Sequence, residues 1–114
     1  MKIIWAQSAK MARVAIVQYL KDEFGRESAI KFNNELKSVV ALIKKYPKSG
    51  EEERFLAHRD EEYRSKLVGS YNKIVYRVLE KEIHIDDLWD TRREPKQQAE
   101  NTGVENIEIA LELK

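Results

Sequence analysis

The stretch YRSKLVGSYNKIVYRVL, residues 63–79, contains two segments with β-strand character separated by a turn. In residues 63–68 polar and apolar side chains alternate, a period of two that is typical of a strand. Gly69 begins a short polar turn, and residues 73–79 are again rich in β-branched and aromatic side chains. The stretch therefore predicts an antiparallel hairpin.

A further strand is expected directly after this hairpin. Residues 80–82 are short enough for a tight connection, and the apolar run Ile83-His84-Ile85 follows, continuing toward Leu88 and Trp89. Two hairpins in a row form an antiparallel meander, which needs a helical layer on one face to bury its apolar side chains.

Two amphipathic helices are predicted before the meander. Apolar residues recur there at steps of three and four residues: Ala9, Ala12, Ile16, Leu20 and Phe24, then Ala29, Phe32, Leu36, Val39 and Ile43. We expect Ser8 to cap the first helix with its hydroxyl and Gly25 to end it. Pro47 and Gly50 should end the second. The short connection predicts an antiparallel helix hairpin.

The complete pattern predicts an α+β domain over residues 1–93. An N-terminal strand at Ile3-Ile4-Trp5 and the helix hairpin pack on a three- to four-stranded antiparallel meander, with a weak strand candidate at residues 53–59. Residues 94–106 are polar and aperiodic, which predicts a linker. The rest, to residue 114, is an amphipathic acidic tail whose spacing fits a strand and a helix equally.

The charged residues nearly balance over the whole chain but not along it. The 114 residues contain 21 Lys and Arg against 20 Asp and Glu, a formal charge of +1. Residues 1–93 carry 19 basic and 15 acidic side chains, hence +4, whereas residues 94–114 carry two and five, hence −3. The total therefore hides a basic domain and an acidic tail, and it does not exclude an anionic partner.

The composition argues against several classes of site. The chain contains no cysteine, which excludes disulfides and thiolate metal sites. His58 has no second ligand at metal spacing, so we expect neither a metal nor a cofactor. No apolar run approaches the ~18 residues of a membrane span, and we expect a cytoplasmic protein without a membrane partner.

Basic side chains concentrate on the meander and just beyond it: Arg64, Lys66, Lys73, Arg77, Arg92 and Arg93. Residues two apart on a strand share a face, so Arg64 and Lys66 project together. Several of these residues on one concave sheet face would form a surface that binds phosphate groups. The alternative is a solvated face on which they pair with the nearby carboxylates Glu61, Glu62, Asp86 and Asp87.

Three further side chains have a structural and a functional interpretation. His84 lies between two isoleucines, which favours a structural strand residue over a general base. Trp5 and Trp89 have rings that can stack on nucleobases, but large aromatic residues in strands favour the core.

Five segments occur in an order that resembles the RelE/ParE superfamily of bacterial toxins. They are Pro47-x-x-Gly50, YRSKL at 63–67, IVYRV at 74–78, Ile83-x-Ile85 and Asp90-Thr91-Arg92-Arg93. The resemblance covers roughly residues 1–95, and the last segment is similar to plasmid-stabilisation proteins of the superfamily. It implies the toxin of a type II toxin–antitoxin module, a growth inhibitor neutralised by a cognate antitoxin encoded beside it.

The superfamily contains two kinds of toxin. The RelE kind enters the ribosome and cleaves mRNA, whereas the ParE kind poisons DNA gyrase. By this resemblance, Arg64 and Lys66 match residues that bind the RNA backbone in the RelE kind. Lys73 matches a phosphate-contacting residue, and Arg93 matches the catalytic arginine.

The sequence departs from the RelE kind after Arg93. Residues 94–103 lack the tyrosine usual there, so Glu62 or His84 would have to take the proton from the 2′-hydroxyl. The long helix hairpin also resembles the ParE kind. We therefore expect a ParE-like, non-nucleolytic toxin. An mRNA endoribonuclease and a non-toxic module that only pairs with an antitoxin stay open, as does the choice between a homodimer and a toxin–antitoxin hetero-oligomer.

Overall fold

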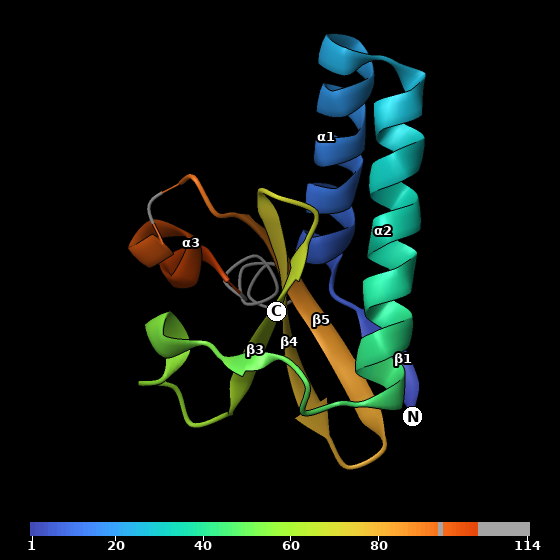
Figure 1. Ribbon diagram of the computed structural model, residues 1–114. Helices are drawn as coiled ribbons and strands as arrows, with labels where there is room; N and C mark the ends of the chain where they lie inside the picture. The colour runs from blue at the N-terminus through green and yellow to red at the C-terminus, as the bar shows by residue number, and fades with distance from the viewer. Residues whose placement is uncertain (94, 103–114) are drawn as a thin grey trace, which may run out of the picture.

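The computed structural model describes residues 1–93 and 95–102 of the chain. The elements follow in this order (Figure 1): β1 (Lys2–Trp5), α1 (Gln7–Phe24), α2 (Arg26–Lys45), β2 (Glu51–Glu52), the 3₁₀ helix η1 (Arg54–Leu56), β3 (Tyr63–Val68), β4 (Asn72–Leu79), β5 (Glu82–Asp90) and α3 (Pro95–Asn101). The α+β class and the strand–hairpin–meander order predicted from the sequence are confirmed. The predicted acidic tail lies outside the described residues.

The strands form one mixed sheet of five strands in the order β1-β5-β4-β3-β2. β5, β4, β3 and β2 are antiparallel neighbours, as the meander predicts, while β1 pairs in parallel with β5 through the register Ile3↔Ile83. Parallel neighbours require a long intervening segment, and here the helix hairpin and the rest of the meander provide it. The N-terminal strand is therefore the outer edge of the sheet beside the last strand.

The two long helices run antiparallel and cover one face of the sheet (Figure 1). Gly25 separates them with a φ of +94°, a conformation that residues with a Cβ rarely adopt. The prediction that Gly25 ends the first helix is confirmed. The prediction for Ser8 is wrong: Ala6 takes the N-cap position, and the Ser8 hydroxyl donates to the carbonyl oxygen of Asp86 at 2.7 Å. Ser8 thus connects α1 to β5.

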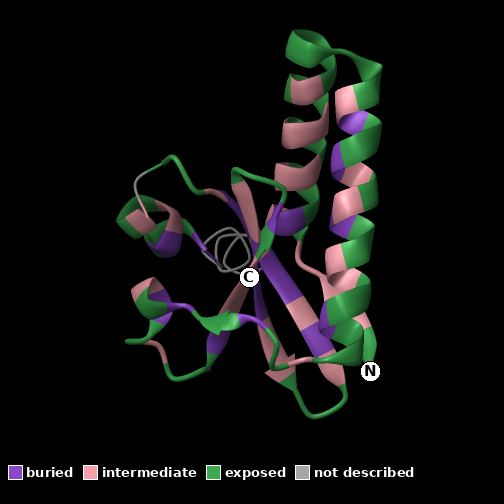
Figure 2. Ribbon diagram, viewed as in Figure 1, coloured by how far each residue is buried: buried purple, intermediate pink, exposed green. Residues whose placement is uncertain are grey.

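The main core lies between the hairpin and the sheet (Figure 2). The helices contribute members of the predicted stripes, and the strands contribute the side chains that point toward them: Ala9, Phe32, Leu36 and Ile43, with Val68, Ile74, Tyr76, Ile83, Ile85 and Leu88. Trp5 is half-buried and packs against this core. Each fully buried large side chain contributes about 1.5–3 kcal/mol, so this layer carries most of the fold's stability.

A second, smaller core lies on the opposite face, called the open face below. It consists of Leu56, Tyr63, Val75, Trp89 and Ala99. The strand expected at residues 53–59 is wrong, because Leu56 turns into this core from η1 and the extra strand is the two-residue β2 before it. The segment 94–106, expected to be a linker, contains α3, whose Ala99 is buried here.

Candidate functional site

Arg64 and Lys66 lie on the helix-covered side of the sheet. In the antiparallel register Arg64 faces Tyr76 and Lys66 faces Ile74, and directly opposed residues project to the same side. Tyr76 and Ile74 belong to the main core, so the two basic side chains emerge beside the end of α2. The prediction that Arg64 and Lys66 project together is confirmed.

The loop after α2 binds both side chains. Arg64 donates to the carbonyl oxygen of Gly50 at 2.9 Å and forms an ion pair with Glu62 at 2.6 Å. Lys66 Nζ lies 3.2 Å from Ser49 Oγ. The buried Tyr76 hydroxyl accepts from the Gly50 amide at 3.0 Å, and a Cβ at Gly50 would lie 2.5 Å from this hydroxyl. Glycine is therefore required where the loop crosses Tyr76.

Lys73 and Arg77 project from the open face instead. Their register partners are Leu67 and Tyr63, and Tyr63 belongs to the second core. Lys73 and Arg77 therefore lie on the opposite face from Arg64 and Lys66, because the hairpin register offsets the β4 cations by one residue from those on β3.

Lys73 forms an ion pair with Glu53, a partner that the sequence pattern did not predict. Its Nζ lies 2.6 Å from Glu53 Oε2, and the Glu53 side chain is only 3% exposed. The same ammonium group lies 4.9 Å from the centroid of the Trp89 ring. The Glu53 carboxylate therefore neutralises the Lys73 ammonium group, which makes Lys73 a weaker phosphate ligand than an unpaired lysine.

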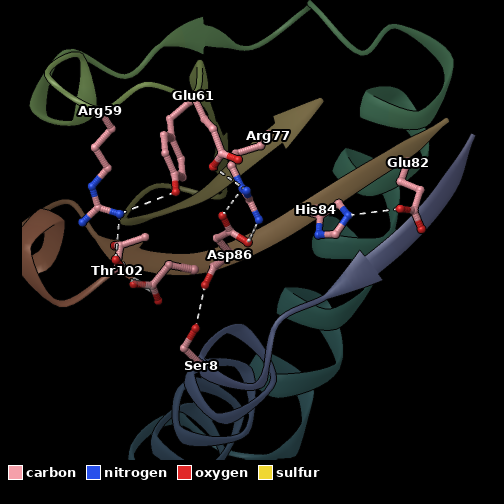
Figure 3. A network of polar contacts seen from close by, with 10 residues as sticks. Ser8, Arg59, Glu61, Arg77, Glu82, His84, Asp86 and Thr102 are labelled. Atoms are coloured by element: carbon pink, nitrogen blue, oxygen red, sulfur yellow. Dashed lines mark hydrogen bonds and ion pairs between the residues drawn. The ribbon is translucent and has the colours of Figure 1, made fainter. Parts of the chain in front are cut away.

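Arg77 lies at the centre of a polar network on the open face (Figure 3). Its guanidinium contacts Asp86 at 2.6 Å and also pairs with Glu61. Asp86 is the extra residue of a β-bulge, since Val75 pairs with Asp87 and Tyr76 with Ile85. Burial raises the pKa of the Asp86 carboxyl, and the hydrogen bond from Arg77 opposes this rise.

His84, one of the two candidate bases, lies opposite Arg77 on this face (Figure 3). Its Nε2 is buried and makes no hydrogen bond within the described structure, although Glu82 Oε1 lies 3.5 Å away. The other candidate, Glu62, pairs with Arg64. The sheet therefore separates His84 from Arg64 and Lys66.

Helix α3 covers the Trp89 end of the open face. Arg59 donates to the carbonyl oxygens of Ala99 and Thr102 at 2.8 and 2.9 Å, where a cation complements the helix C-terminus. Trp89 Nε1 donates to the Thr102 hydroxyl at 3.0 Å, and Thr102 Oγ1 lies 3.0 Å from Asp87. Trp89 is 1% exposed, so the prediction of a core role is confirmed.

Arg92 and Arg93 follow β5, which ends beside the β3–β4 turn. Arg92 binds Asp90 through two nitrogens, each at 3.1 Å, and its guanidinium lies 4.4 Å from the Tyr71 ring centroid. The hydrogen bond from Arg92 is the main reason that the pKa of Asp90 is lowered. Thr91 donates from its amide to the Tyr71 carbonyl at 2.7 Å. Arg93 is exposed.

Four of the six predicted basic residues are therefore paired with carboxylates in the part of the chain that the structure describes. The pairs are Arg64 with Glu62, Lys73 with Glu53, Arg77 with Asp86 and Glu61, and Arg92 with Asp90. Within residues 1–93 and 95–102, no group of three or more His, Cys, Asp and Glu could hold a metal ion. No helix in the same residues is long and apolar enough to cross a membrane.

A family model for the ParE toxin of the type II toxin–antitoxin system parDE matches residues 3–95. This chain belongs to the ParE toxin family. The match runs from β1 to the first residue of α3 and confirms the RelE/ParE resemblance. Most of α3, including the buried Ala99, lies beyond the region shared with the ParE family model.

A solved structure described as the chromosomal ParDE TA system from P. aeruginosa has the same fold as this ParE family member. The TM-score is 0.64 at 20% sequence identity, and the alignment covers 79% of this chain and 95% of the other. No match was found among curated proteins.

Sequence reasoning missed Glu53, Arg59 and Thr102 as partners of the predicted residues. Glu61, Glu62 and Asp86 could be named, because short-range charge alternation suggests ion pairs. The missed residues lie 20 positions from Lys73, 40 from Ala99 and 13 from Trp89, respectively, and no local period links them. Only the folded chain brings these residues together.

Proposed function

We propose that this ParE family member is a ParE-like toxin that acts without cleaving nucleic acid, directed at DNA gyrase and neutralised by a cognate antitoxin. The toxin would act in the cytoplasm as a growth inhibitor of the plasmid-stabilisation type. It would form a hetero-oligomer with the antitoxin, whose binding blocks the inhibition.

The division of the basic residues between two sheet faces carries the proposal. Cleavage of RNA at the 2′-hydroxyl needs a base beside the attacking oxygen and cationic donors beside the phosphate in one place. Arg64 and Lys66 lie on the helix-covered side, while Lys73 and His84 lie on the open face. His84 therefore cannot act on a phosphate bound by Arg64 and Lys66. Glu62, the other candidate base, is already engaged in an ion pair with Arg64, which favours an inhibitor that acts by binding.

The helix hairpin supports a protein partner. Met11 is 53% exposed and Val14 69% exposed, both on the side of α1 that faces away from the main core. Met11 and Val14 are one helical turn apart, so their exposed side chains are neighbours that a partner segment could cover. An antitoxin segment that covers the outer side of α1 would complete this packing.

The test combines growth and supercoiling measurements. Induced expression of the chain should arrest growth, and co-expression of the small protein encoded beside it should restore growth. The purified chain should inhibit supercoiling by DNA gyrase, and an equimolar amount of the neighbouring protein should abolish that inhibition.

Primer extension on mRNA after induction separates the two kinds of toxin. The proposal predicts an unchanged pattern of mRNA ends. Cuts at the ribosomal A site would contradict it and favour the RelE kind. Growth and supercoiling that are both unaffected by the pure chain would favour the non-toxic pairing module.

A further inference from the structure

Strand β1 is the outer edge of the sheet, with β5 as its neighbour on one side. Figure 3 shows β1 in blue alongside β5. The amides of Lys2 and Ala6 donate to carbonyl oxygens on the β5 side, at 3.1 and 2.9 Å. Backbone groups alternate in direction along a strand, so the amides and carbonyls of Ile3 and Trp5 point away from the sheet. No hydrogen bond uses these four outward groups in the part of the chain that the structure describes.

The two edges of the sheet differ in their protection against further pairing. Proteins keep exposed edges apart with charged side chains, prolines, bulges or very short strands. The opposite edge, β2, consists only of Glu51 and Glu52, so two copies that met there would bring carboxylates together. β1 has the sequence KIIW, in which three of the four residues are apolar and the single charge is at one end. β1 is therefore the edge that can accept another strand.

The outward backbone groups of β1 are complementary to those of a second copy that runs antiparallel to it. Around a twofold axis at Ile4, Ile3 of each copy faces Trp5 of the other. A directly opposed pair of this kind exchanges two hydrogen bonds, so the two pairs use all four outward groups of each copy. In the same register Ile4 faces Ile4 of the second copy and Lys2 faces Ala6. No like charges are therefore opposed across the axis.

The side chains of β1 have apolar surface to contribute to such a contact. Ile3 and Trp5 pack against the main core on the helix-covered side, and both are only half-buried. Ile4 lies beside His84 on the open face and is also half-buried. In the twofold arrangement each of these side chains faces an apolar side chain of the second copy, and removing apolar surface from water favours association.

We propose that β1 pairs with β1 of a second copy of this chain, which joins the two five-stranded sheets into one continuous sheet. This inference goes beyond the proposed function and needs neither gyrase nor an antitoxin. The occupant is a second copy because a single register satisfies every outward backbone group of the edge and opposes no like charges. A pair of four-residue strands is a small contact, so the dimer should be weak and should depend on protein concentration.

The first test is oxidative cross-linking, which is specific here because the chain contains no cysteine. In the proposed register the two copies of residue 4 form a non-hydrogen-bonded pair with Cα atoms about 4.5 Å apart, and a disulfide spans about 4.4–6.8 Å. Ile4→Cys should therefore give mostly disulfide-linked dimer on a non-reducing gel. The matched control is Lys2→Cys, on the same face of the same strand. Its two thiols would lie roughly 13 Å apart, so this variant should stay monomeric although Lys2 is the more exposed residue.

A second test exchanges charges and needs no covalent bond. Ile4→Lys and Ile4→Glu should each sediment as monomers at concentrations at which the wild type forms dimers, because like charges then face each other. An equimolar mixture of the two variants should associate again, since opposite charges then face each other. All variants should keep the wild-type circular dichroism, which shows that they are folded. In the unsubstituted chain, the amides of Ile3 and Trp5 should exchange hydrogen roughly tenfold more slowly when dimer predominates than when monomer predominates.

Several outcomes would overturn this inference. Equal cross-linking of Lys2→Cys and Ile4→Cys would indicate random collision instead of a fixed register. A wild-type chain that stays monomeric at millimolar concentration, or a charge mixture that associates no better than either variant alone, would exclude the pairing. Protection of the Ile3 and Trp5 amides that appears only after the protein encoded beside this chain is added would assign the edge to that protein. None of these measurements uses gyrase or growth, so a failure of the proposed function is seen separately.

Discussion

The two faces of the sheet are stabilised by different interactions. On the helix-covered face, α1 and α2 bury aliphatic and aromatic side chains against β4 and β5. On the open face, a small apolar core is surrounded by ion pairs and hydrogen bonds that connect β4 and β5 with Glu53, which precedes η1, and with Thr102, which follows α3. Apolar packing depends on volume and tolerates conservative change, whereas a buried polar contact depends on both of its partners. The two faces should therefore respond differently to mutation and to pH.

The largest effect is expected on the helix-covered face. Leu36 is 1% exposed at the centre of α2, so Leu36→Ala should lower the free energy of unfolding by about 4 kcal/mol through lost burial and a cavity. Urea unfolding followed by circular dichroism measures this change. Leu42→Ala is the control on the same helix, because Leu42 is 44% exposed and should cost little. Equal losses of stability in the two variants would contradict the burial of Leu36 in the main core.

The next effect tests the buried ion pair of the open face. Lys73→Met should cost about 3 kcal/mol, because it leaves the Glu53 carboxylate buried without a cation. The double variant Glu53→Gln/Lys73→Met should recover much of this loss, since no buried charge remains. A double-mutant cycle by urea unfolding measures the coupling. Additive losses would show that the two residues act independently.

A smaller effect is expected where α3 joins the open face. Arg59→Ala removes two charge-assisted hydrogen bonds, one to Ala99 in α3 and one to Thr102 just after it, and should cost about 2 kcal/mol. It should also expose Trp89 and shift its fluorescence to longer wavelength. Arg54→Ala is the control, because Arg54 is exposed and lies over Phe55 in the neighbouring η1. Unchanged emission in Arg59→Ala would contradict the proposed role of Arg59 in holding α3.

The smallest effect is a pH dependence with opposite signs at two aspartates. Burial raises the pKa of Asp87, although the hydrogen bond with Thr102 opposes it. Between the pKa of the unfolded chain and the higher pKa of the folded state, the folded protein keeps a proton that the unfolded chain has lost. The contribution of Asp87 to stability therefore falls as the pH rises between these two values. Asp90 has a lowered pKa, chiefly because Arg92 donates to it, so its contribution is lost as the pH falls through the folded value.

Urea unfolding of the wild type, Asp87→Asn and Asp90→Asn between about pH 3 and pH 7 measures both trends. Relative to wild type, Asp87→Asn should become less stable as the pH falls, and Asp90→Asn should become more stable. The same trend in both variants would contradict the assignment.

The helix-covered face was largely predictable from the sequence. The stripe that contains Phe32, Leu36 and Ile43 has the period of a helix, and a period of this kind specifies which side is buried without knowledge of the partner. Gly25 predicted the turn between the helices, because glycine adopts a positive φ more readily than residues with a Cβ. The prediction that Ser8 caps the first helix was wrong, because its hydroxyl donates to the carbonyl oxygen of Asp86 on β5, 78 positions away in the sequence.

The candidate site was predictable only in part. The sequence identified the basic residues and three of the carboxylates that pair with them, namely Glu61, Glu62 and Asp86. Nothing in the sequence indicated that Arg92 stacks on Tyr71, 21 positions earlier, because the pairing of β4 with β5 brings these residues together.

The sequence by itself determined the order of the elements, the apolar sides of the helices and the ParE family to which the chain belongs. The tertiary structure alone decided that Lys73 and Arg77 lie on the face opposite Arg64 and Lys66, and that Lys73 pairs with Glu53. The physical reason is that a shift of one residue in strand register moves a side chain to the other face of a sheet. Local periods specify which side is buried, but register depends on contacts across the whole fold.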